Sequence, residues 1–157
     1  MSTNTIRIET RYIARASPSQ PAFVLQATCL AGSYMLWIGT AEDGGRGDDE
    51  SAKRLVAQGS VARDWACAMP PIQGRPALGT PLFRTSGSDA ALGMAQRLAR
   101  RFGKQMFLSV DVAGGFMSGE QGLLGAERAL VSTLKELEGE GDGVGAAGAG
   151  GDTNTAA

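Results

Sequence analysis

The sequence predicts an α+β domain with a mostly antiparallel sheet of five or six strands and two main helices on one face. Three observations support this fold class. Strand-like segments joined by turns fill the first half of the chain, and two segments with helical periodicity flank a later strand. One strand is apolar at every position, and two helices can cover only one face of its sheet. The other face is therefore predicted to be available for sheet-to-sheet dimerisation.

The size of the chain is that of a single domain. It has 157 residues, of which 43% are hydrophobic, enough for one ordinary core. The domain is expected over residues 1–138, with a mobile loop at 41–59, where glycines and arginines are set among acids. Residues 139–157 are nearly free of large apolar groups, so a disordered Gly/Ala-rich tail is predicted there.

The first strand is expected over Thr5–Tyr12. The alternation there puts Ile6, Ile8 and Thr10 on one side and charged residues on the other, the pattern of a half-buried strand. A turn signal containing two prolines follows this segment.

Two apolar segments close together in sequence predict an antiparallel hairpin, formed by Phe23–Leu30 and Tyr34–Thr40. The mobile loop comes next, and its second half could add a short helical turn. Strand character resumes over Val61–Met69, and two prolines stop that strand.

A short strand is expected around Leu78–Arg84, where Pro81 suggests a sheet edge or an irregular ladder because it has no amide hydrogen to donate. The clearest helix follows. Ser88 is a plausible N-cap, Asp89 lies in the first turn, and Gly103 stands where a C-terminal glycine is favoured.

Both predicted helices carry an apolar stripe that a sheet could cover. Between them, Lys104–Val112 reads as a strand, and the second helix is expected over Leu123–Leu137. The stripe of the first helix consists of Leu92, Ala95, Leu98, Ala99 and Phe102, and that of the second of Leu123, Ala126 or Glu127, Leu130, Leu134 and Leu137.

Composition argues against several functional classes. The chain has no histidine, which removes the commonest proton-transfer group near neutral pH and the imidazole metal ligand. Cys29 and Cys67 each lie in an apolar run, as expected for buried, reduced thiols. The glycine-rich stretch at residues 39–47 does not match the phosphate-binding P-loop motif, and no Gly-x-Gly-x-x-Gly turn connects a predicted strand to a predicted helix with an acidic residue downstream. We therefore predict a non-enzymatic protein without a cofactor or metal.

The apolar stretches of the chain are short. No apolar stretch approaches the about 20 residues needed to cross a bilayer, and the first ten residues lack the apolar core of a secretory signal. A soluble protein of the cytoplasm, or of the nucleus as well, is expected.

The apolar sheet supplies the first candidate site. Met35 and Trp37 lie in the fully apolar strand, and Trp65 and Phe107 raise the same need for a second covering layer. These four residues are candidates for a dimer interface on the sheet face. The alternative is that the loop before residue 60 folds back over the sheet as a lid.

A basic cluster supplies the second candidate site, formed by Arg97, Arg100, Arg101 and Lys104 at the end of the first predicted helix. It could be a solvated face at the negative end of a helix dipole, a contact for an acidic protein surface, or a phosphate-binding patch. The formal net charge of the chain is −1, and aromatic residues are not interleaved with the cluster. A small nucleic-acid-binding module is therefore kept only as the alternative function.

The segment SDAALGMAQRLARRFGKQMFLSVDV, with YMLWIGTA before it and GAERALVSTLKEL after it, resembles the proteasome assembly chaperone 4 family. The similarity covers roughly Ile6 to Glu138 and is most specific in AQRLARRFGKQMFLS, residues 95–109. The loop from Glu42 to Gly59 looks longer than the family pattern, and the tail is unmatched.

The resemblance implies a chaperone that pairs, through apposed sheets, with a related small subunit of the proteasome assembly chaperone 3 type. The pair would assist assembly of the alpha ring of the 20S proteasome core. The basic cluster would then contact a proteasome alpha-type subunit, and no nucleic acid or membrane partner is expected.

Overall fold

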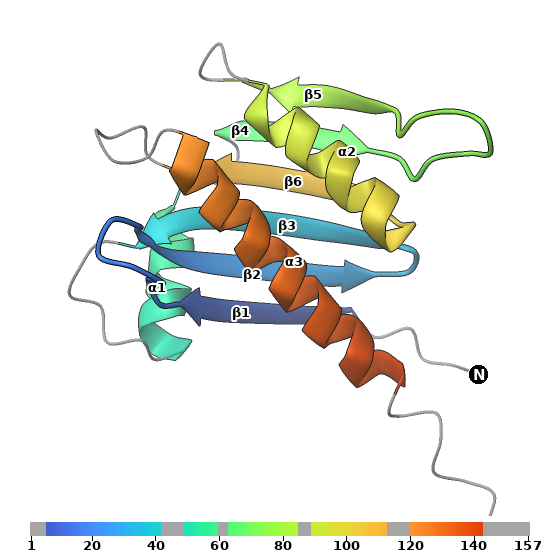
Figure 1. Cartoon of the computed structure of the whole chain (residues 1–157). Helices are drawn as coiled ribbons and strands as arrows, with labels where there is room; N and C mark the ends of the chain where they lie inside the picture. The colour runs from blue at the N-terminus through green and yellow to red at the C-terminus, as the bar shows by residue number, and fades with distance from the viewer. Residues whose placement is uncertain (1–5, 42–48, 60–62, 85–88, 113–119, 143–157) are drawn as a thin grey trace, which may run out of the picture.

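The computed structural model of the chain describes residues 6–41, 49–59, 63–84, 89–112 and 120–142. These residues form six strands and three helices (Figure 1). In chain order the elements are β1 (Arg7–Ile13), β2 (Ala22–Leu30), β3 (Ser33–Ala41), α1 (Asp49–Gln58), β4 (Asp64–Ala68), β5 (Gly79–Phe83), α2 (Ala90–Phe102), β6 (Gln105–Asp111) and α3 (Glu120–Asp142). The predicted α+β class is confirmed.

The six strands form one mixed sheet in the order β1-β2-β3-β6-β4-β5. The β3 and β6 strands pair parallel, whereas the other neighbouring strands pair antiparallel. The prediction of a mostly antiparallel sheet did not include this parallel junction. It arises because α1, the β4–β5 hairpin and α2 separate β3 from β6, so that β6 re-enters the sheet beside β3 in the same direction.

Helices α2 and α3 lie on the same face of the sheet, with α2 over β4 and β6 (Figure 1). Their apolar stripes meet the inward residues of the central strands, as the helical periodicity predicts. The largest fully buried side chains of this core are Leu25, Leu36, Ile38, Met94, Leu98, Met106, Leu108, Leu130 and Leu134.

Helix α2 ends as the sequence predicts. Gly103 adopts a left-handed conformation with φ of 62°, and its amide donates a 3.0 Å hydrogen bond to the carbonyl of Ala99. At the other end Asp89 is the N-cap residue but makes no side-chain capping hydrogen bond. Its carboxylate instead lies 2.7 Å from Nη2 of Arg84. The predicted cap, Ser88, lies outside the described residues.

Two helices extend further than the sequence predicts. Residues 49–58, expected in a mobile loop over 41–59, form the ten-residue helix α1, and Ala41 belongs to β3. Helix α3 runs through Asp142, past the predicted start of the tail at residue 139. Alanine, leucine and charged residues support helix in α1 once its apolar side is packed. Residues 42–48 and 143–157 lie outside the described part.

Strand β1 is half-buried on both sides, and its isoleucine at position 8 is exposed, contrary to the predicted pattern. Ile6 and Ile8 are 62% and 61% exposed. The register with β2 places Arg7, Glu9 and Arg11 opposite core-facing residues, and the Glu9 carboxylate lies within 3.3 and 3.9 Å of nitrogens of the two arginines. Because β1 is an edge strand at the rim of the core, long charged side chains can keep their ends in water there.

The strand at the opposite edge of the sheet is the one that the sequence predicts there. Strand β5 is the other edge strand and contains Pro81, which the prediction placed at an edge. Strand β4 covers Asp64–Ala68, within the predicted Val61–Met69, of which residues 61 and 62 lie outside the described part. A register shift between Trp65 and Ala66 marks an irregular pairing with β5.

Candidate protein-interaction surface

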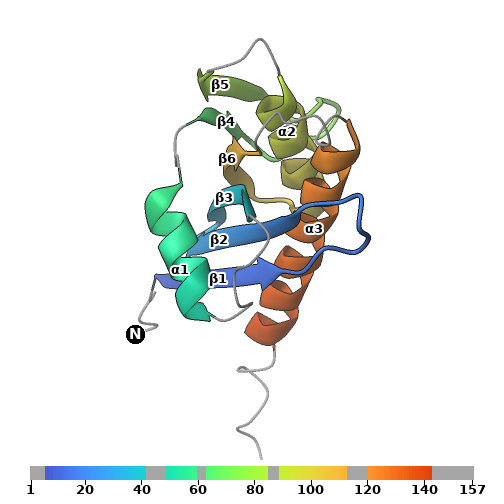
Figure 2. The ribbon, with the colours of Figure 1, turned by 90° about the vertical axis from the view of Figure 1, so that its left-hand side faces the viewer.

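The sheet face turned away from α2 and α3 is only partly covered. Helix α1 packs against β1 and β2 on this face, while α2 and α3 lie on the other side of the sheet (Figure 2). The predicted lid from the segment before residue 60 is thus present in part. It covers one end of the strands and leaves the other end open.

One row of side chains crosses the open end of this face, and we call it the open strip. The strand registers align its members across five neighbouring strands, from β1 through β2, β3 and β6 to β4. The open strip consists of Ile8, Thr28, Met35, Phe107 and Cys67. Met35 is 43% exposed, and Phe107 is half-buried. Two of the four residues predicted for the dimer face therefore lie side by side in it.

The other two predicted residues lie in the next row, toward α1. Trp37 and Trp65 both align with Ser109 of β6, one from each neighbouring strand. Trp65 is half-buried, whereas Trp37 is only 5% exposed because it packs in a small cluster with Val24 and residues of α1. Trp37 is thus on the predicted face but is largely covered by α1.

The packing of Trp37 depends on two glycines. A Cβ atom at Gly39 would lie 2.6 Å from the Trp37 ring, and one at Gly59, just after α1, would also collide with it. The absence of side chains at both positions leaves room for the indole between the sheet and α1. This contact fixes how far α1 extends over the face.

A hollow of about 150 Å³ separates the two tryptophans, and we call it the Ser109 hollow. It is lined by Gln26, Thr28, Met35, Leu36, Trp37, Trp65 and Ser109. Ser109 is 3% exposed, and its hydroxyl has no hydrogen-bond partner within the described residues. Sequence reasoning missed this residue, because a serine in an apolar strand carries no signal of what surrounds it.

The four residues of the predicted basic cluster lie in two separate places: the three arginines are at one groove, and Lys104 is in another cluster. The Arg97 guanidinium forms a two-pronged ion pair with Glu127 of α3, with Nε 2.6 Å from Oε1 and Nη2 2.7 Å from Oε2. This bonding raises the pKa of Arg97 above its ordinary value. Arg100 and Arg101 are exposed. All three arginines and Glu127 line a groove of about 320 Å³ between α2 and α3.

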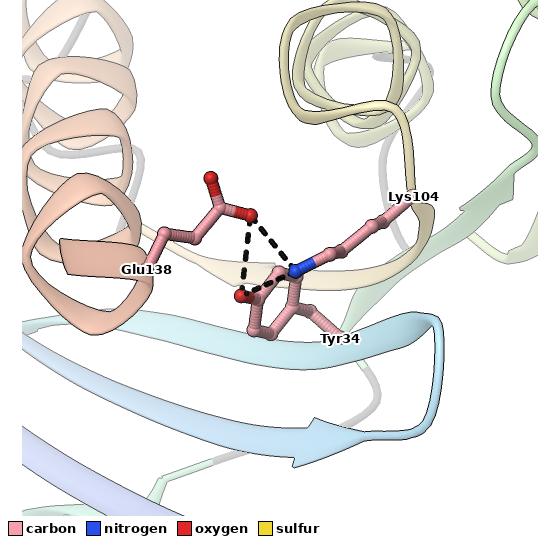
Figure 3. Close-up of polar contacts among 3 residues, drawn as sticks. All are labelled: Tyr34, Lys104 and Glu138. Atoms are coloured by element: carbon pink, nitrogen blue, oxygen red, sulfur yellow. Dashed lines mark hydrogen bonds and ion pairs between the residues drawn. The ribbon is translucent and has the colours of Figure 1, made fainter. Parts of the chain in front are cut away.

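Lys104 belongs to a different cluster, with Tyr34 and Glu138 (Figure 3). Its ammonium lies 2.9 Å from Oε1 of Glu138 and 3.2 Å from the Tyr34 hydroxyl, which itself donates to Glu138 over 3.4 Å. The ammonium is also 4.8 Å from the centre of the Tyr34 ring. The cluster joins β3, the turn before β6, and the end of α3.

The pKa values in this cluster follow from its contacts. Burial alone lowers the pKa of Lys104, but the hydrogen bonds to Glu138 and Tyr34 outweigh it and hold that pKa above its usual value. Burial raises the pKa of the Tyr34 phenol, against the opposing effect of the Lys104 hydrogen bond. Both groups are therefore held in their protonated forms.

The cysteines and acidic residues show no arranged site in the described part of the chain. Cys29 and Cys67 are free and half-buried, and burial raises the pKa of the Cys29 thiol. No group of three or more His, Cys, Asp or Glu side chains in this part is placed to hold a metal ion. None of the described helices is long and apolar enough to cross a membrane.

Comparison with protein families identifies a related family. A family model described as proteasome assembly chaperone 4 matches residues 22–112, more than half of the chain. The matched part runs from β2 through β6, so it includes four of the five open-strip residues and the whole of α2. It is shorter than the range over which the sequence resembles the family, and α3 lies outside it. No curated protein matches the chain in sequence.

Proposed function

The chain belongs to the proteasome assembly chaperone 4 family, and on that premise we propose that it pairs with a related subunit of the proteasome assembly chaperone 3 type. The family assigns it a part in proteasome assembly as a chaperone. The proposal adds that the pair assists formation of the alpha ring of the 20S core, without catalysing a reaction. It would act in the cytoplasm, and in the nucleus as well.

The open strip is the observation that carries this proposal. It presents Ile8, Met35 and Phe107 to solvent in line across the sheet, although α1 covers the same face only a few residues away. An apolar row across several strands suits a second flat sheet, which packs about 10 Å away with interdigitating side chains. A stable pair of this kind buries about 1,200 Å² or more in total.

Titration of the purified chain with the chaperone 3-type subunit tests the pairing. Met35→Asp places a charge in the middle of the open strip, so we expect binding to weaken by about a hundredfold, the cost of burying an unpaired charge. The matched control is Leu124→Asp, which makes the same kind of change at a 54% exposed leucine of α3. Equal affinity of the Met35→Asp variant and the unmodified chain would contradict pairing through this face.

The alpha-subunit contact is proposed for Arg100 and Arg101. These two arginines are exposed beside the α2–α3 groove, whereas Arg97 and Lys104 already bind carboxylates of α3. Charges of this kind mainly steer association with an acidic surface and set its orientation. Of the four basic residues predicted for this contact, these two arginines are therefore the main candidates.

Association kinetics with isolated alpha-type subunits test this contact. The double substitution Arg100→Ala and Arg101→Ala should lower the association rate constant by about tenfold at low salt and by less at high salt. The control pair, Arg128→Ala and Lys135→Ala, removes the same charge from exposed positions of α3. A loss that is equal for both pairs would mean that only net charge matters and would count against a specific contact.

The nucleic-acid alternative has less support from the site. Two of the four basic residues that it would use are neutralised by Glu127 and Glu138. A phosphate backbone would have to compete with these carboxylates at close range. No specific observation favours that function over pairing with a protein.

A further inference from the structure

We propose that the partner subunit inserts one uncharged side chain with a polar tip into the Ser109 hollow, where it hydrogen-bonds the Ser109 hydroxyl. This inference rests on the proposed function, because it needs a partner sheet on the open face. It specifies the chemistry at the centre of that interface. The inserted side chain would lie between Trp37 and Trp65 and would fix the register of the two sheets.

The Ser109 hydroxyl is the first observation behind this proposal. Ser109 is 97% buried, yet its Oγ has no hydrogen-bond partner in the described part of the chain. Buried hydroxyls in folded proteins are nearly always satisfied, because an unpaired one loses its bonds to water without replacement. The register places Ser109 between Trp37 and Trp65 on the face that carries the open strip, so its hydroxyl faces the hollow.

The size and lining of the hollow define the occupant. Its volume of about 150 Å³ matches that of cavities that accept a benzene-sized group. The walls formed by Met35, Trp37 and Trp65 favour an apolar body. The polar groups within reach, on Gln26, Thr28 and Ser109, are all uncharged. A charged tip would therefore be buried without a counter-charge, which leaves an uncharged polar tip as the fitting chemistry.

A second copy of this chain is a poorer occupant. In a face-to-face pair it would offer its own open strip, whose members are Ile8, Thr28, Met35, Cys67 and Phe107. Four of these are apolar or carry sulfur, which is a weak hydrogen-bonding atom. The fifth, Thr28, has a side chain too short to fill a hollow of this volume. The occupant is therefore assigned to a different chain.

The test combines two measurements on the full-length chain: its dissociation constant for the purified chaperone 3-type subunit, and its own unfolding midpoint in denaturant. Ser109→Ala removes the hydroxyl. We expect binding to weaken by about five- to tenfold, as for loss of one hydrogen bond between uncharged groups. The unfolding midpoint of the isolated chain should not fall, because none of the described residues hydrogen-bonds this hydroxyl. A merely structural role for Ser109 would instead lower the midpoint.

Two further variants make the outcome decisive. Ser109→Val fills part of the hollow with methyl groups and should weaken binding by more than Ser109→Ala. Thr133→Val, which removes another buried hydroxyl, lies on α3 on the other side of the sheet and should leave the dissociation constant unchanged. Binding by both Ser109 variants at the unmodified affinity would overturn the inference while leaving the proposed pairing intact.

Two other results separate the remaining possibilities. If the unmodified chain does not bind the subunit at all, the proposed pairing fails, and the inference fails with it. If light scattering shows that the isolated chain forms a dimer and Ser109→Val abolishes that dimer, the occupant is a second copy, which overturns its assignment to a different chain.

Discussion

Replacing Lys104 with Met removes the cation from the Tyr34–Lys104–Glu138 cluster while keeping a side chain of similar length. The ammonium lies 2.9 Å from the Glu138 carboxylate and 3.2 Å from the Tyr34 hydroxyl. The side chains of Lys104 and Glu138 are 37% and 34% exposed, so solvent screens their attraction in part. A contribution of about 1 kcal/mol follows, at the upper end for surface pairs and below the about 1.5–3 kcal/mol of hydrogen bonds to charged groups.

A double-mutant cycle isolates this contribution. The free energy of unfolding is measured in urea for Lys104→Met, Glu138→Gln and the double variant, and we expect a coupling of about 1 kcal/mol between them. The Arg84–Asp89 pair serves as the control. Its side chains are 45% and 62% exposed, so its coupling should be about 0.2–0.5 kcal/mol. A Lys104–Glu138 coupling no larger than the control value would refute the argument from partial burial.

The same cluster predicts a dependence of stability on pH. The pKa of Lys104 is higher in the folded chain than its ordinary value, so the folded state holds this proton more tightly than the unfolded state does. The stabilisation is therefore complete below the unfolded pKa of about 10.4 and is lost as pH rises through the folded pKa. The raised pKa of Tyr34 acts in the same direction. Lys104→Met should flatten the fall in unfolding free energy above about pH 10, and an unchanged slope would contradict this assignment.

Three further substitutions test the packing by equilibrium denaturation. Gly39→Ala should lower the free energy of unfolding by about 1–3 kcal/mol, because its Cβ would meet the Trp37 ring at 2.6 Å. Gly103→Ala should cost about 1–2 kcal/mol, since φ is 62° there, and no loss would mean that the turn relaxes freely. Leu134→Ala should cost about 2–5 kcal/mol, because Leu134 is a fully buried core residue of α3. A smaller loss would show that α3 is loosely attached to the sheet.

Local patterns were sufficient for the predictions that depend on near neighbours in sequence. The apolar stripes of α2 and α3 and the left-handed Gly103 follow from helical spacing and glycine preference. The excess of apolar residues around Met35 and Phe107 suggested a second covering layer, and the strand register puts both residues on the face opposite those helices. The interface role of these residues stays a prediction.

Features that depend on distant residues could not be predicted. The orientation of Ile8 is set by the register of β1 on β2, because its own alternation is equally compatible with either face. Helix α1 is longer than the short helical turn that the sequence suggested within a loop, since its apolar side packs against Trp37. The partners of Arg97 and Lys104 come from α3, and nothing near the basic cluster indicates Glu127 or Glu138.

The parallel junction of β3 and β6 has a kinetic consequence. The β1–β2, β2–β3 and β4–β5 pairs are local hairpins, whereas β3 meets β6 only after the intervening chain has closed into a long loop. We expect pulse-labelled hydrogen exchange to show the β3–β6 amides protected last. The open strip crosses that junction between Met35 and Phe107. A chain that has not completed its sheet therefore offers no continuous surface to a partner, so folding would be finished before assembly begins.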